Sequence, residues 1–133
     1  MIVVTTAGCS GGGMETLLVT SECVFNGPEQ MEEGPVRLTL NQEGLGETGA
    51  VIVQILDDRT YQELTAHFED VSPQWGERPD WLRVKASLSV DGGTASASTS
   101  ATLTSGTHAV ICIRYWEDDS AMPVARLEVE SVD

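Results

Sequence analysis

Most of the chain alternates between apolar and polar residues with a period of two. In "GPVRLTLN", Val36, Leu38 and Leu40 are apolar, while the residues between them are polar or charged. Successive side chains of a strand point to opposite faces, so this alternation predicts a strand with one buried face. The same period predicts a first strand, closed by the turn "NGPEQ", with one face made of Leu17, Val19, Ser21, Cys23 and Phe25.

Two other segments are apolar at nearly every position. They are "GAVIVQIL" and "HAVICIRY", residues 49–56 and 108–115. Runs of this length are typical of central strands that are buried on both faces. Further strands are predicted in "WLRVKASLSV" (81–90), "TASASTSATL" (94–103) and "VARLEVES" (124–131).

The period changes once, after residue 60. Thr60 is followed three residues later by Glu63, which is the pattern of a helix-capping box. Leu64 and Phe68 follow at helical spacing, so we predict a short helix over residues 61–69. About seven strands with one helix inserted in a connection predict an all-β fold, a Greek-key β-sandwich.

Length and charge narrow the possible functions. The chain has 133 residues, enough for one domain, which we place at residues 14–133. Its 21 acidic and 7 basic side chains give a net charge of −14. This charge argues against nucleic acid and against anionic lipid head groups as partners, because both require clustered basic residues. Most of the acidic side chains are expected to form a solvated surface.

The stretch "TTAGCSGGG", residues 5–13, has three interpretations. Ser10 lies in a G-x-S-x-G pattern, which is typical of the nucleophile of esterases. That nucleophile needs a strand before it, a helix after it and a histidine base, and the flanking residues predict neither element. We therefore expect no enzyme activity. An incidental cysteine in a glycine-rich tether is the plainest alternative.

The third interpretation is a bacterial lipoprotein signal. Cys9 follows the small residues Ala7 and Gly8, and a serine and three glycines come after it. Residues 1–13 would then be a signal-peptide remnant and a flexible tether, with lipid attached to Cys9. Thr6 departs from the usual apolar residue, and only eight residues precede the cysteine. This interpretation predicts an extracytoplasmic domain held to the membrane only by its lipid anchor.

Several short motifs together resemble a known family. They are Cys-x-Phe-x-Gly-Pro at 23–28, Gly-Pro-Val at 34–36, and Gly-Thr-x-x-x-x-Cys at 106–112. In this order and spacing, over residues 17–131, the chain resembles the cupredoxin-like domains of bacterial secreted lipoproteins. The resemblance implies a blue-copper-type sandwich.

The copper ligands of that family are not matched in this sequence. A blue-copper site uses a thiolate, two imidazoles and a weak thioether. "GETGAVIV" has no histidine, and none follows Cys112, although Met122 does. His108 lies four residues before Cys112, about 13 Å along a strand, which is too far for one metal. We expect no metal and no cofactor. The alternative is a degenerate copper or electron-transfer protein that uses Cys112, His108 and Met122.

Two cysteines remain if Cys9 carries lipid. In an exported protein Cys23 and Cys112 are expected to form a disulfide that joins the first strand to a late central strand. The alternative is a pair of buried free thiols in a cytosolic protein.

Aromatic residues gather in the connections of the predicted sandwich. They are Trp75, Trp81, Tyr115 and Trp116. Aromatic side chains in loops are suited either to contact a protein or glycan partner or to cover the ends of the core. The sequence thus predicts a monomeric, non-catalytic domain with a binding or structural role in the cell envelope.

Overall fold

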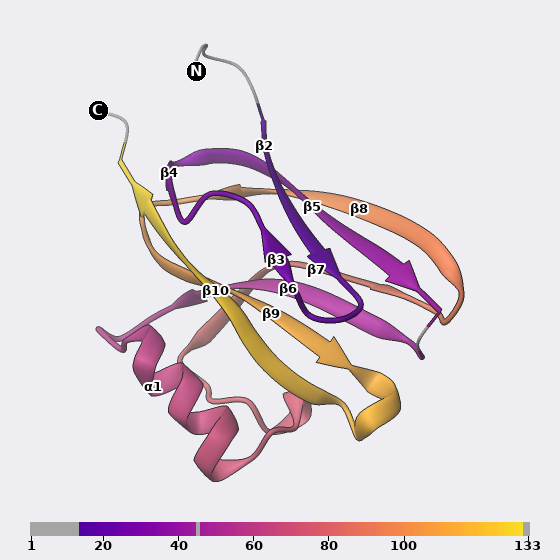
Figure 1. The fold of residues 1–133 in the computed structure, drawn as a ribbon. Helices are drawn as coiled ribbons and strands as arrows, with labels where there is room; N and C mark the ends of the chain where they lie inside the picture. The colour runs from indigo at the N-terminus through magenta and orange to yellow at the C-terminus, as the bar shows by residue number, and fades with distance from the viewer. Residues whose placement is uncertain (1–13, 45, 132–133) are drawn as a thin grey trace.

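The computed structural model describes residues 14–44 and 46–131, which form a sandwich of two β-sheets (Figure 1). Strand order in the five-stranded sheet is β4 (Gln30–Glu32), β10 (Ser120–Glu130), β9 (Gly106–Arg114), β6 (Thr48–Ile55) and β7 (Leu82–Val90). In the four-stranded sheet it is β3 (Phe25–Asn26), β2 (Glu15–Thr20), β5 (Gly34–Glu43) and β8 (Thr94–Leu103). The predicted all-β sandwich is confirmed.

Most neighbouring strands are antiparallel, and the exceptions are the pairs β4–β10 and β2–β5. The two apolar runs form β6 and β9, which are paired with each other in the interior of the larger sheet. Both are buried on both faces, as predicted. The chain passes from one sheet to the other at several connections, so residues far apart in sequence meet between the sheets.

Two apolar clusters pack against the larger sheet. The inner cluster fills the space between the two sheets and includes Leu17, Leu38, Leu40, Ile52, Val110, Cys112 and Leu127. The outer cluster covers the opposite face of the larger sheet and includes Val51, Val53, Leu64, Phe68, Ile111 and Ile113. Because β6 and β9 contribute to both clusters, their apolar residues need no alternation.

A helical segment covers the outer cluster. Helix α1 (Tyr61–Ala66) begins with the predicted capping box: the Thr60 side chain accepts from the Glu63 N–H, and the Glu63 carboxylate accepts from the Thr60 N–H. The chain continues as one π-helical turn, η2 (His67–Val71), so the helix ends two residues later than predicted. After a short 3₁₀ turn, η3 (Trp75–Glu77), it returns to the sheet at β7.

The first predicted strand is wrong beyond Thr20. The backbone reverses there: the Cys23 N–H donates to the Thr20 carbonyl, and the Thr20 N–H donates to the carbonyl of Val24. Strand β3 then runs back beside β2. Cys23 adopts a left-handed conformation with φ of 63°. Ser21 is buried because its hydroxyl accepts from the N–H of Glu43, a partner that the alternation could not reveal.

Candidate functional site

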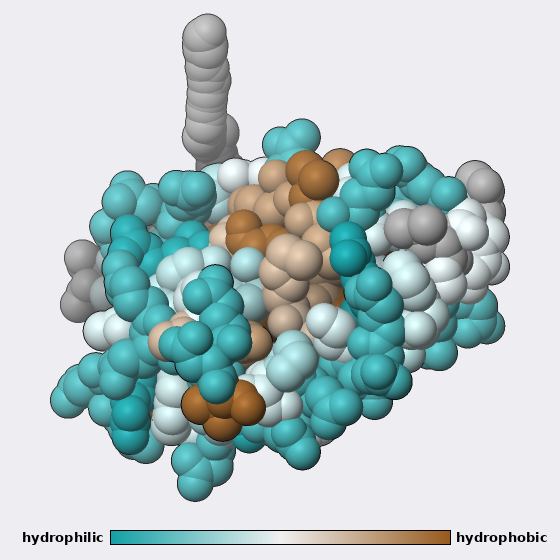
Figure 2. All heavy atoms as spheres, turned by 60° about the horizontal axis from the view of Figure 1, so that its bottom comes forward, coloured by the Kyte–Doolittle hydropathy of each residue, from teal (hydrophilic) through white to brown (hydrophobic). Residues whose placement is uncertain are grey.

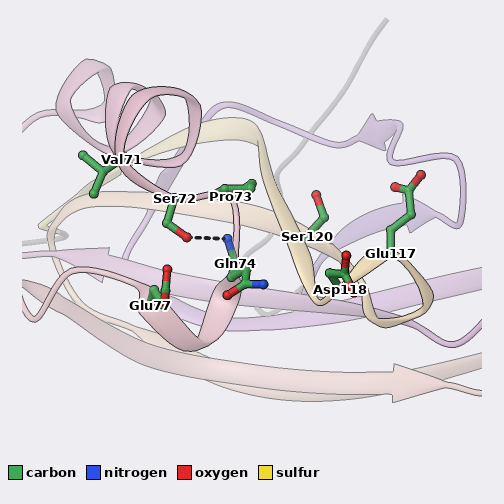
Figure 3. A pocket seen from close by; sticks show the side chains of 8 residues that line it. All are labelled: Val71, Ser72, Pro73, Gln74, Glu77, Glu117, Asp118 and Ser120. Atoms are coloured by element: carbon green, nitrogen blue, oxygen red, sulfur yellow. Dashed lines mark hydrogen bonds between the residues drawn. The ribbon is translucent and has the colours of Figure 1, made fainter.

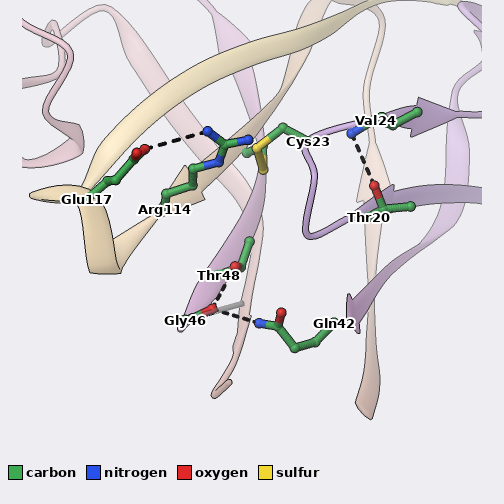
Figure 4. Close-up of a disulfide and its surroundings, with 9 residues drawn as sticks. Thr20, Cys23, Val24, Gln42, Gly46, Thr48, Arg114 and Glu117 are labelled. Atoms are coloured by element: carbon green, nitrogen blue, oxygen red, sulfur yellow. Dashed lines mark hydrogen bonds and ion pairs between the residues drawn. A yellow bond between two sulfur atoms is a disulfide. The ribbon is translucent and has the colours of Figure 1, made fainter. Parts of the chain in front are cut away.

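A disulfide joins the two sheets at one end of the sandwich (Figure 4). Cys23 and Cys112 are bonded at 2.03 Å, with their Cα atoms 5.5 Å apart and a sequence separation of 89. This confirms the predicted pair and removes the alternative of two free thiols. Cys112 is fully buried on β9, whereas Cys23 is half-buried in the turn that follows β2.

Two side chains on the face of Cys112 lie next to the disulfide. Met122 on β10 is the direct cross-strand partner of Cys112. Arg114 is two residues after Cys112 on β9 and therefore lies on the same face of the sheet. Its guanidinium is directed toward the disulfide in Figure 4 and forms a 3.5 Å ion pair with Glu117. The Nε atom of Arg114 is shielded from solvent and has no hydrogen-bond partner among the described residues.

A short hydrogen-bond network holds the loop that precedes β6 at this end. The Gln42 amide donates to the carbonyls of Gly46 and Val90, at 2.9 and 3.3 Å, and the Thr48 hydroxyl donates to Gly46 at 3.0 Å. Trp116 packs over Gly46 so closely that a Cβ at this glycine would overlap the indole ring. The loop and the indole therefore support each other.

Apolar side chains are exposed around the disulfide. The exposed fraction is 54% for Val24, 45% for Trp116 and 43% for Met122. We call the surface formed by these three residues, Cys23 and Arg114 the disulfide end. Exposed acidic residues lie close to it in sequence: Glu22, Glu117, Asp118 and Asp119. Exposed Glu47 is brought near it by a hydrogen bond from the Tyr115 N–H to the Glu47 carbonyl. Figure 2 shows, on the face that it draws, an apolar area surrounded by hydrophilic side chains.

The aromatic residues singled out from the sequence do not form one cluster. The N–H of Trp75 donates to the carbonyl of Asp119, in the connection between β9 and β10. The carbonyl of Trp81 accepts from the N–H of Leu56, directly after the last residue of β6. Both indoles and the Tyr115 ring are half-buried against the outer cluster. Trp116 is therefore the one member of the predicted set that is largely exposed.

Each tryptophan lies near an arginine. The guanidinium carbon is 4.5 Å from the ring centroid for Arg78 and Trp75, 5.3 Å for Arg59 and Trp81, and 5.9 Å for Arg114 and Trp116. Trp75 also stacks on Phe68, with centroids 6.4 Å apart. Burial raises the pKa of Tyr115, and the nearby carboxylates of Glu47 and Asp119 raise it further. These contacts favour a packing role for Trp75, Trp81 and Tyr115.

A shallow hollow lies beside the connection between β9 and β10 (Figure 3). It measures about 520 Å³ and is lined by Val71, Ser72, Pro73, Gln74, Glu77, Glu117, Asp118 and Ser120. The only hydrogen bond drawn among these residues is local, from the Gln74 N–H to the Ser72 hydroxyl at 3.2 Å.

The residues of this chain do not fit a blue-copper centre. The sulfur of Cys112 is bonded to Cys23, so it is no thiolate in this state. The chain has two histidines, and they lie on opposite sides of the larger sheet. His67 is on η2 over the outer face, with Nε2 2.9 Å from the Glu77 carbonyl. His108 shares the inner face with Cys112, so one metal cannot bind both imidazoles.

His108 is fully buried near the other end of β9. Its Nδ1 lies 3.2 Å from the Gly106 carbonyl, and Nε2 has no partner among the described residues. Burial lowers the pKa of His108 below its usual value, and the nearby Lys85 lowers it further. Across the described residues, no group of three or more His, Cys, Asp and Glu side chains is placed to hold a metal ion.

Comparison with solved structures shows the fold. Auracyanin A, a "blue" copper protein from the green thermophilic photosynthetic bacterium Chloroflexus aurantiacus, superposes with a TM-score of 0.51. The match has 14% sequence identity and covers 89% of this chain and 100% of that one. The fold is cupredoxin-like. Reduced auracyanin from Roseiflexus castenholzii matches with a TM-score of 0.45 and 12% identity, over 89% of this chain and 95% of that one. No protein-family model and no curated protein sequence matches significantly.

Some site residues were missed from the sequence, and some predictions lie outside the described residues. Arg114 was missed, although its position two residues after Cys112 places both on one face of a strand. Val24 was missed because its exposure depends on the reversal at Cys23. Cys9 and Ser10 fall outside the described residues. The lipid anchor therefore stays a prediction.

Proposed function

We propose that this chain is a non-catalytic binding domain of the cell envelope, built on a cupredoxin-like scaffold that works without a metal. The disulfide end is the proposed binding surface. The observation that carries the proposal is the pairing of Cys112 with Cys23 at an end of the sandwich where three apolar side chains are exposed. Instead of a free thiolate, Cys112 contributes to a covalently held, partly apolar surface.

The chemistry of this surface indicates the kind of partner. Exposed apolar side chains at the centre of an interface supply most of its binding energy, and the polar rim sets specificity and association rate. Val24, Met122 and Trp116 supply the apolar centre, and the adjoining carboxylates supply an acidic rim. A protein with an apolar centre and basic side chains around it would complement both features.

The test compares variants in a binding experiment. Immobilised protein would be incubated with an envelope extract, and the retained proteins would be identified and their affinities measured. We expect Trp116→Ala with Met122→Gln to lose the partner that the native protein retains. Val84→Ser is the matched control, because Val84 is 42% exposed but lies on the edge strand β7, where it pairs with Val53. Equal retention by all three proteins would contradict the proposal.

Location in the envelope is a separate proposal with its own test. Among the described residues no helix is long and apolar enough to cross a bilayer. The lipid on Cys9 would therefore provide the attachment. In cells that process lipoproteins, Cys9→Ser should move the protein from the membrane fraction to the soluble fraction. A native protein that is found in the soluble fraction would contradict the anchor without touching the binding proposal.

A further inference from the structure

We propose that the Cys23–Cys112 disulfide is exchangeable in the folded protein, and that thiols attack it at Cys23. The inference goes beyond binding, because it assigns a thiol–disulfide exchange activity to the disulfide end. The reductant would be a protein dithiol carried on a basic surface.

The two cysteines differ in exposure. Cys112 is fully buried on the central strand β9, whereas Cys23 is half-buried in a turn between two exposed residues, Glu22 and Val24. A thiolate attacks a disulfide sulfur in line with the bond that breaks, and access decides which sulfur is attacked. Cys23 packs in part against the inner cluster but stays partly exposed in the turn, so the proposed in-line approach to its sulfur is from the surface.

Arg114 supplies the charge that the leaving group needs. Attack at Cys23 expels Cys112 as a thiolate, and an apolar interior would by itself oppose that charge. Arg114 follows Cys112 on the same face of β9 and is directed toward the disulfide (Figure 4). Its Nε–H is shielded from solvent and has no partner among the described residues, so it is free to interact with the new thiolate.

The complete reaction needs one dithiol. The first thiolate of the dithiol forms a bond to the Cys23 sulfur while the Cys23–Cys112 bond breaks, and the electron pair leaves on Cys112. The second thiol of the dithiol then loses its proton and attacks the mixed disulfide, which releases Cys23. The dithiol is oxidised to a disulfide, and Cys23 and Cys112 are reduced and take up two protons.

Exchange kinetics test the proposal on the whole chain. Loss of the disulfide with dithiothreitol would be followed by mass spectrometry of alkylated samples, next to the rate of global unfolding under the same conditions. We expect a rate that rises in proportion to thiol concentration and exceeds the unfolding rate. A rate that is independent of thiol concentration and equal to the unfolding rate would show a purely structural disulfide and overturn the proposal.

Variants of Arg114 test the leaving-group assignment. Arg114→Gln should slow exchange by about three- to tenfold, because the leaving thiolate becomes more basic, and Arg114→Lys should recover most of the rate. Arg126→Gln is the matched control, since Arg126 is an exposed arginine on β10 that pairs with Glu128. Equal exchange rates in the native protein and Arg114→Gln would overturn the role of Arg114.

Small thiols of different charge test the site of attack. The acidic residues beside Cys23 should make 2-aminoethanethiol react faster than 2-mercaptoethanol, and 3-mercaptopropionate slower, at equal thiolate concentration. High salt should reduce these differences.

In Cys112→Ser, Cys23 should form a stable mixed disulfide with oxidised 2-aminoethanethiol while the protein stays folded. A Cys23 that cannot be modified in the folded variant would overturn the proposal. Neither result depends on partner capture, so the binding proposal can fail separately.

Discussion

The inner and outer clusters share the larger sheet, but different parts of the chain close them. The inner cluster is closed by the smaller sheet, whose strands come from residues 15–43 and 94–103, and by the disulfide. The outer cluster is closed by one continuous segment that leaves β6 at Ile55 and returns to β7 at Leu82. The first closure is long-range and covalent, whereas the second is local and non-covalent.

This difference predicts how the molecule opens. A local segment can detach from its sheet while the strands stay paired, because apart from a short bridge between Gln74 and Ser120 it takes no part in the strand pairing. The two sheets cannot separate in that way while the disulfide is intact. We therefore expect the cover of the outer cluster to be the first part to lose protection, and the inner cluster to open only with global unfolding.

The largest expected effect comes from removing the covalent closure. Cys23→Ala with Cys112→Ala should lower the free energy of unfolding by about 4 kcal/mol, because the bridge closes a loop of 89 residues in the unfolded chain. Urea denaturation under non-reducing conditions measures the change, and Cys9→Ser is the control. A change below about 1 kcal/mol would mean that the two sheets hold together without the disulfide.

A large but local effect is expected in the outer cluster. Phe68→Ala should cost about 3–4 kcal/mol, because Phe68 is buried beneath η2 and stacks on Trp75. Hydrogen exchange should show lost protection over residues 61–77, with little change in β2 and β5. If protection fell equally in all strands, the outer cover would be part of the global unfolding unit.

A smaller effect is expected from pH at the inner face. The folded state lowers the pKa of His108, so below about pH 6.5 the unfolded chain binds more protons than the folded one. The free energy of unfolding should therefore fall as pH drops below 6.5, until the folded histidine also becomes protonated. His108→Leu should remove this slope, and His67→Leu, on the outer side of the sheet, serves as its control. The same slope in His108→Leu would assign it to another group.

The smallest expected effect lies at the start of α1. Thr60→Ala should cost about 1 kcal/mol, because the capping box loses the hydroxyl that accepts from the Glu63 N–H. Thr60→Ser keeps that hydroxyl and should stay close to the native value. Thermal denaturation compares the two. In Thr60→Ala, the lost stability should appear as faster hydrogen exchange in α1. Faster exchange in β9 instead would show that the inner and outer clusters do not open independently.

Several elements were predictable because local patterns determine them. The alternation at Val36, Leu38 and Leu40 required a strand with one inner face, and β5 has it. The runs in β6 and β9 required burial on both faces. Thr60 and Glu63 specified where α1 begins, because the capping box involves only residues three apart. The motifs around Cys23 and Cys112 were enough to place the chain in a cupredoxin-like fold.

The tertiary structure decided the features that depend on contacts between distant segments. The chain reverses near Cys23, so that β3 runs antiparallel to β2. The alternation of apolar and polar residues continues through this reversal, and it therefore could not distinguish a turn from one continuous strand. The separation of His67 and His108 depends on which face of the sheet the helical segment covers. The exposure of Trp116 and the burial of Trp75 follow from their neighbours on other elements. By itself the sequence determined the strands and their inner faces, because these depend on near neighbours. Which side chains meet around the disulfide was decided only when the two sheets packed together.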